Sequence, residues 1–114
     1  YNSAVATFCH NIARGLPMES VRAINAFAVG RTRPHLTLVL DMPAQAAWER
    51  IHRTGRELDR MESQPLAFFE KVRQGYLDEA DLETGRIRVV DASRSIEEVE
   101  MEITQIVEDR LNAL

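Results

Sequence analysis

The chain has 114 residues, of which 45% are hydrophobic and 28% are charged, and this composition fits one small domain with a core rather than a disordered segment. The net charge of −4 argues against a nucleic-acid partner, because nucleic-acid binders normally carry a basic surface. Cys9 is the single cysteine, so no internal disulfide forms, and no apolar run approaches the ~20 residues of a membrane span. We therefore expect a cytoplasmic protein with neither a membrane nor a nucleic-acid partner.

The first part of the chain predicts two helices and a strand. The helices cover residues 3–10 and a segment from Pro17, which suits a first helical position, to about residue 30. Residues 36–40 form a nearly continuous apolar run with a β-branched member, the pattern of a strand buried on both faces. Asp41 ends this strand, and we expect it to cap the next helix rather than to meet a magnesium-bound water. The apolar stripe expected to bury the second helix consists of Val21, Ile24, Phe27 and Ala28.

Two further helices follow, separated by a loop. Pro43 opens the first of them, and Gly55 is expected to end it in a left-handed backbone conformation. Residues 56–64 have no apolar stripe and predict a loop, whereas residues 66–80 show a new helical stripe.

The last part of the chain predicts a second buried strand over residues 87–90 and a long final helix. Ser95, with Glu98 three residues on, forms a capping box that starts this helix. Its expected inward-facing residues are Ile96, Val99, Ile103, Ile106, Val107, Leu111 and Leu114. The order of elements predicts an α/β fold with two parallel strands flanked by helices. Because two parallel strands are not stable as a pair, we expect an exposed strand edge that associates with further polypeptide.

Several segments, in this order and spacing, resemble the C-terminal part of the thymidylate kinase family of P-loop nucleoside monophosphate kinases. They are Arg14-Gly15-Leu16, RPHLTLVLD at 33–41, ELDRME at 57–62, FFEKVRQGY at 68–76 and IRVVDAS at 87–93. The resemblance covers nearly all of residues 1–114 and implies the fourth and fifth strands of a five-stranded P-loop NTPase-type sheet. Tyr1 resembles the tyrosine of the family's Asp-Arg-Tyr motif, so the P-loop and the missing strands are expected from an absent N-terminal half or a second chain.

The resemblance also implies an activity and its partners. The intact enzyme would transfer the γ-phosphate of ATP to dTMP, giving dTDP, as a homodimer, with this chain forming the lid and adenine side and residues 50–64 the lid itself. Magnesium would arrive with ATP. His10, His35, His52 and Cys9 make no metal-ligand spacing, so no metal site is predicted in the chain itself.

The candidate catalytic residues are Arg53 and Arg56, which flank Gly55 as a hinge. Phosphoryl transfer needs positive charge and alignment, and the planar arginine fork supplies both. Some members of the family are expected to supply this arginine from the lid. Arg50 is a candidate for cofactor binding, although it would also brace the helix. The alternative for Arg53 is a solvated helix face on which Glu49 pairs with it at i,i+4.

The second strand leads into a candidate adenine-binding loop, by resemblance to the family. Its residues are Asp91, Ala92, Ser93 and Arg94, since small side chains let a base lie against the backbone and the arginine would cover the ring. The alternative is a plain turn before the Ser95 cap.

The candidate residues for binding the nucleoside monophosphate are Ser3, Thr7, Phe8 and Arg14, again by resemblance. Ser3 fits the family pattern, but Thr7 stands where an aromatic residue is expected and Phe8 comes one residue late. Arg14 would otherwise form a salt bridge. Phe68, off the apolar stripe, fits the core or the acceptor pocket. A P-loop kinase for another nucleoside monophosphate therefore stays open, as does a non-catalytic remnant or interaction module that associates through the strand edge. Residues 1–114 alone are expected to be inactive.

Overall fold

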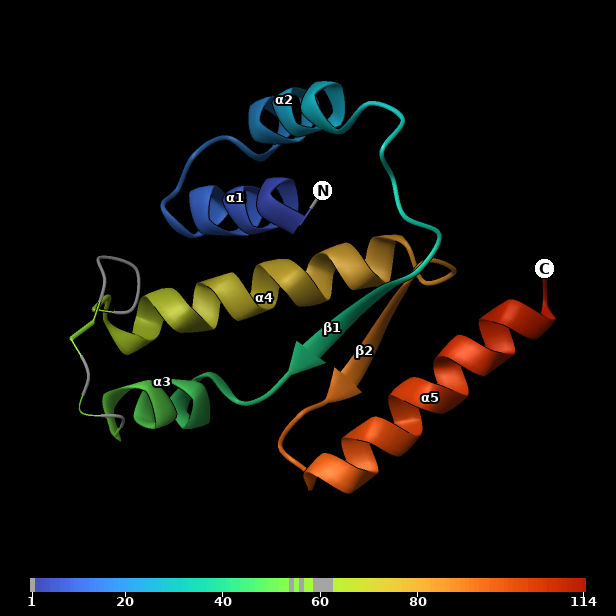
Figure 1. Cartoon of the computed structure of the whole chain (residues 1–114). Coiled ribbons are helices and arrows are strands. Elements are labelled where there is room, and N and C mark those ends of the chain that lie inside the picture. The colour runs from blue at the N-terminus through green and yellow to red at the C-terminus, as the bar shows by residue number, and fades with distance from the viewer. Residues whose placement is uncertain (1, 54, 56, 59–62) are drawn as a thin grey trace.

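In a computed structural model of the chain, the helices and strands follow one another in the order α1-α2-β1-α3-α4-β2-α5 (Figure 1). The structure describes residues 2–53, 55, 57, 58 and 63–114, without the side chains of residues 2–4 and 7. The α/β class predicted from the sequence is confirmed. The bounds are α1 Asn2–Ala13, α2 Met18–Val29, β1 Thr37–Asp41, α3 Ala44–Arg53, α4 Leu66–Leu82, β2 Ile87–Asp91 and α5 Ile96–Asn112.

Local signals account for several of the helix ends. The backbone N–H of Glu98 donates to the Ser95 hydroxyl oxygen at 3.2 Å, which confirms Ser95 as the cap of α5. Pro17 occupies the capping position of α2 instead of the predicted first helical position, because its ψ of 121° is extended. Gly55 has a φ of +69°, which a glycine adopts without strain and which fits its predicted place beyond α3.

The two strands pair in parallel, as the sequence predicts. The register runs from Thr37 opposite Ile87 to Asp41 opposite Asp91, so both strands begin and end at the same levels. At the carboxyl end, the N–H of Ala92 donates to the Asp41 carbonyl oxygen at 2.7 Å. The loops that leave β1 and β2 therefore start side by side.

The helices are layered on both sides of the strand pair. Figure 1 shows the strands between α4 and α5, with α1 beyond α4 and α2 outermost. A core of Phe8, Cys9 and Val21 joins α1 and α2 to α4, whose Val72 and Tyr76 pack against it. The absence of a side chain at Gly75 permits the close approach, since a Cβ there would lie 3.3 Å from the Cβ of Cys9.

Several positions predicted to be buried are exposed. Leu40 is 58% exposed and Phe27 is 91% exposed, although a strand buried on both faces and a buried α2 stripe were expected. The other exposed apolar residues at positions predicted to be buried are Ile24, Ala28, Val89, Ile96, Leu111 and Leu114. The reason is that the described elements do not cover these faces. The radius of gyration of 15.4 Å, against about 13 Å for a compact domain of this length, agrees with open layers.

None of the helices in the described part of the chain is long and apolar enough to cross a membrane.

Candidate functional site

The carboxyl edge of the strand pair brings two of the predicted site segments together. β1 ends at Asp41 and leads within three residues into α3, which carries Arg50 and Arg53. β2 ends at Asp91 and leads into the loop before α5. Ligands of parallel α/β sheets bind outside the carboxyl ends of the strands. The fold thus places the predicted lid helix and the predicted adenine loop at the edge where a nucleotide would bind.

The side chain of Asp91 organises the β2–α5 loop. Its Oδ1 atom accepts hydrogen bonds from the hydroxyl of Ser93 at 2.5 Å and from the backbone N–H of Ser93 at 3.0 Å. Both bonds favour the charged carboxylate and so hold the pKa of Asp91 below its ordinary value, and the bond from the Ser93 hydroxyl contributes most. The carboxylate therefore stabilises the turn above its unfolded-state pKa, and this contribution is lost as the pH falls through the lower folded-state pKa.

Replacing Ser93 by Ala is expected to raise the pKa of Asp91 toward its ordinary value of about 3.9. The reason is that the hydroxyl hydrogen bond, which stabilises the charged carboxylate most, is lost. NMR titration of the carboxyl carbon measures this pKa. Ser95→Ala is the matched control, since Ser95 lies in the same loop but bonds Glu98 instead. An equal Asp91 pKa in the wild-type and Ser93→Ala proteins would contradict the assignment.

Arg94 is fixed against the same loop. Its Nε donates to the Asp91 carbonyl oxygen at 3.2 Å, and its Nη2 pairs with the carboxylate of Glu102 on α5. The side chain of Ala92, between them, is half-buried. The loop therefore has a defined shape, with small side chains at Ala92 and Ser93 and an anchored Arg94 guanidinium. Its contact with adenine stays a prediction.

The arginines of α3 lie on its last turn. Arg50 and Arg53 are exposed, and Arg56 lies outside the described residues. Glu49 accepts a hydrogen bond from Gln45 at 3.2 Å, and within the described residues it forms no ion pair with Arg53. The i,i+4 pair with Glu49 that the alternative interpretation expects for Arg53 is therefore absent among the described residues.

The candidates on α1 and its C-terminal end have mixed surroundings. Phe8 is 6% exposed and belongs to the core, with the guanidinium of Arg22 lying 4.8 Å from its ring centroid. The side chains of Ser3 and Thr7 lie outside the described part of the structure. The guanidinium of Arg14 lies 5.8 Å from the ring centroid of Phe68. The structure thus groups Arg14 with Phe68 at the lid end of α4 and gives Phe8 a packing role.

The sequence did not reveal a second cation at the strand edge. Arg73 of α4 donates from Nε and Nη2 to the two carboxylate oxygens of Asp41, at 2.8 and 3.0 Å. The carboxylate expected to cap α3 is therefore paired with an arginine 32 residues away. No local spacing signals such a pair, because it depends on how α4 crosses β1.

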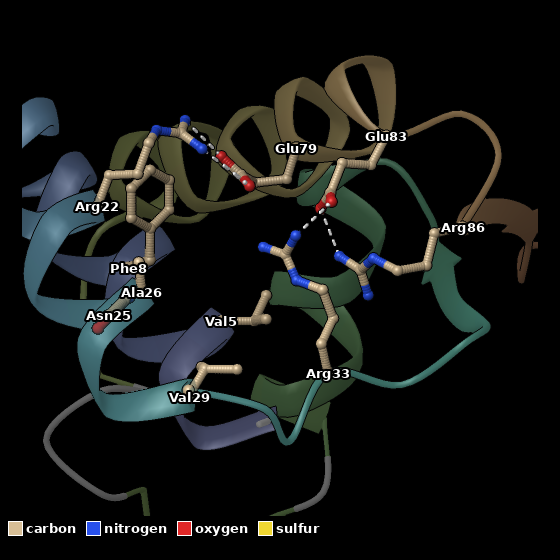
Figure 2. Close-up of a pocket in the computed structure, with 11 residues that line it drawn as sticks. Val5, Phe8, Arg22, Asn25, Ala26, Val29, Arg33, Glu79, Glu83 and Arg86 are labelled. Carbon is tan, nitrogen blue, oxygen red and sulfur yellow. Dashed lines mark hydrogen bonds and ion pairs between the residues drawn. The ribbon is translucent and has the colours of Figure 1, made fainter.

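A pocket of about 340 Å³ lies at the opposite end of the strands, and Figure 2 shows its lining. Arg22 pairs with Glu79 at 2.7 Å, and Glu83 pairs with Arg33 at 3.1 Å and with Arg86 at 2.5 Å. The hydrogen bond from Arg86 leads the causes that hold the pKa of Glu83 below its ordinary value. Arg33 and Arg86 precede the two strands, so this pocket is separate from the carboxyl edge, and its ion pairs tie α2, α4 and the strand starts together.

Two parallel strands flanked by helices, with the cationic α3 and the β2–α5 loop beginning at their carboxyl edge, define an α/β fold. The family model described as thymidylate kinase matches residues 5–103. The chain belongs to the thymidylate kinase family, as its sequence motifs indicate.

Curated relatives agree with this family. The chain is 49% identical over 100 residues to a thymidylate kinase of Symbiobacterium thermophilum, covering 88% of this chain and 46% of the relative. It is 48% identical over 92 residues to one from Syntrophotalea carbinolica, covering 76% and 43%. For one from Kosmotoga olearia the identity is 38% over 92 residues, covering 81% and 44%. The chain therefore spans about half the length of the curated relatives it matches.

Proposed function

We propose that the protein to which this chain belongs transfers the γ-phosphate of ATP to dTMP, giving ADP and dTDP, and that this chain supplies the lid and adenine side of the active centre. The observation that carries the proposal is the common strand edge at which α3 and the β2–α5 loop begin, in a chain of the thymidylate kinase family. The names of the relatives support the reaction.

The roles of the residues follow from the chemistry of the transfer. The bond between the γ-phosphorus and the β–γ bridging oxygen breaks, and a bond forms to a phosphate oxygen of dTMP. Arg53 and Arg56 would bind the phosphoryl oxygens as charge moves, because a guanidinium offers paired donors and stays charged. Arg50 would bind the phosphates of ATP from the same helix. Gly55, whose φ of +69° suits a glycine, would act as the hinge between these arginines.

The β2–α5 loop would hold the adenine. Ala92 and Ser93 present small side chains, and the anchored Arg94 would lie over the ring. Magnesium bound with ATP would neutralise charge on the β- and γ-phosphates. Among the described residues, no group of three or more His, Cys, Asp or Glu side chains is placed to hold a metal. Delivery of the ion with ATP remains a prediction.

The partners and setting of the intact enzyme are part of the proposal. Further strands, from a preceding half or from a second chain, would pair beside β1, where a hollow of about 420 Å³ is lined in part by Val5, Tyr76 and residues 37–40. The exposed Leu40 and Phe27 support such association. We also propose a cytoplasmic homodimer.

A second substrate class is favoured by one observation. Thr7 stands where the family pattern has an aromatic residue, in the region that would face the nucleoside base. Another nucleoside monophosphate is therefore the alternative acceptor.

Assay of the full-length protein with ATP, magnesium and a panel of monophosphates (dTMP, dUMP, dCMP, dGMP) tests the proposal. Formation of dTDP with the highest kcat/KM for dTMP is expected. A preference for another monophosphate would support the alternative acceptor. Absence of ADP formation with every acceptor would contradict kinase activity and favour a non-catalytic interaction module.

A further inference from the structure

The ion pair between Asp41 and Arg73 has a geometry that fixes orientation. Its two N–H···O bonds, at 2.8 and 3.0 Å, run side by side from one guanidinium to one carboxylate. The side chains are 17% exposed for Asp41 and 39% exposed for Arg73, so the bonds are partly shielded from water. Such bidentate pairs constrain angle as well as distance. The hydrogen bond to Asp41 also raises the pKa of Arg73.

Asp41 connects three elements at the strand edge. Its carboxylate binds Arg73 on α4, and its carbonyl oxygen accepts the N–H of Ala92 in the β2–α5 loop at 2.7 Å. Two residues later, the carbonyl oxygen of Pro43 accepts the N–H of Ala47 at 3.1 Å in the first turn of α3. The direction in which α3 leaves the strand is thus set within two residues of the ion pair.

Arg73 belongs to a part of α4 that has little freedom to move. Gly75, two residues on, is in close contact with Cys9 of α1, as the 3.3 Å distance from its would-be Cβ shows. Tyr76 packs against the same core. Arg73 therefore extends from the tightly packed layer of α1 and α4. Through the ion pair, the position of this layer constrains the position of Asp41 at the end of β1.

We propose that Asp41 and Arg73 are positioning residues for phosphoryl transfer, which fix the direction in which α3 leaves the strand and so the position of Arg53 at the far end of that helix (Figure 1). This inference rests on the proposed kinase function. Neither residue needs to touch a substrate, since the effect passes through the start of α3. Displacement of a group that binds the transferred phosphate by about 1 Å is enough to lower the rate strongly.

The test compares two carboxylates in the full-length enzyme. Asp41→Asn removes the negative charge that pairs with Arg73, and Glu79→Gln is the matched control. Glu79 is also 17% exposed and also pairs with an arginine, Arg22, at 2.7 Å, but it lines the pocket near the starts of the strands, away from their carboxyl edge. We expect similar losses in melting temperature. Only Asp41→Asn is expected to lower kcat, by about tenfold, with KM for dTMP within about twofold of the wild type.

A double-mutant cycle shows whether the effect passes through Arg53. In an Arg53→Ala background, Asp41→Asn is expected to have little further effect on kcat, because the group that it positions is gone. Arg73→Lys keeps the positive charge but loses the planar fork, so a kcat between those of the wild-type and Asp41→Asn enzymes is expected. This variant also tests the ion pair if Asp41→Asn folds poorly.

Three results would overturn the inference while leaving the kinase function intact. They are equal kcat values for the Asp41→Asn and Glu79→Gln enzymes, a full additional loss from Asp41→Asn in the Arg53→Ala background, and no effect of Arg53→Ala itself. A wild-type protein that forms no nucleoside diphosphate would instead refute the proposed function.

Discussion

Replacing Arg53 by Ala in the full-length protein is expected to lower kcat by roughly 10²–10³-fold or more, and Arg56→Ala by a similar factor, with little change in melting temperature. Arg53 is exposed at the end of α3 and forms no ion pair with Glu49, so its removal costs the fold little. In the transition state, however, the guanidinium would offset charge spread over the γ-phosphoryl oxygens. Steady-state kinetics with saturating ATP and dTMP measure the loss.

Arg31→Ala is the matched control for this experiment. Arg31 is also an exposed arginine, but it lies between α2 and β1, away from the carboxyl edge of the strands. Its removal is expected to leave kcat close to that of the wild type, because Arg31 lies away from the site, and to change stability by no more than about 0.5 kcal/mol, as for most surface substitutions. Arg53→Lys keeps the charge without the planar fork and is expected to recover only part of the rate. Unchanged turnover in both the Arg53→Ala and the Arg56→Ala enzymes would remove the lid arginines from the mechanism.

The elements and their pairing were predictable because their signals are local. Each apolar run that ends in an aspartate became a strand, and the Ser95 hydroxyl caps α5 as its spacing from Glu98 indicates. The burial of those elements was not predictable in the same way. Leu40 has the apolar character of a residue buried in a full sheet, yet it is 58% exposed beside the described elements. The apolar pattern of a strand reflects all the strands and helices that pack against it in the folded protein. The described elements alone leave part of this strand uncovered.

In the candidate site, too, the features that depend on local sequence were predictable and those that depend on long-range packing were not. That the Asp91–Arg94 loop and α3 start at one edge follows from the parallel register, which the sequence indicates. The Asp41–Arg73 pair joins residues 32 positions apart on different elements, and no spacing rule finds it. For Phe8, helical spacing alone does not separate a core position from a substrate contact, and the structure places it in the core. Both the Asp41–Arg73 pair and the core position of Phe8 therefore depend on long-range packing, which sequence motifs do not show.

A polypeptide of residues 1–114 is expected to have no kinase activity on its own. The phosphate-binding loop of P-loop enzymes needs a glycine-rich turn whose backbone N–H groups surround the phosphates, followed by a lysine and a serine or threonine. No such segment occurs in these residues, whose five glycines are widely spaced. The arginines of α3 would have no held polyphosphate to close over. Chromatographic detection of ADP and dTDP, with ATP, magnesium and dTMP at millimolar concentration, measures any activity.

The full-length protein at equal concentration is the positive control, and it is expected to form both products under the same conditions. Mixing the 114-residue polypeptide with a separately purified segment that carries the glycine-rich loop extends the test. If the exposed edge of β1 receives the missing strands, the mixture is expected to recover part of the activity that neither piece has alone. Turnover by the 114 residues without any second polypeptide would show that phosphate binding does not require the glycine loop, and the division of the active centre between two halves would then be wrong.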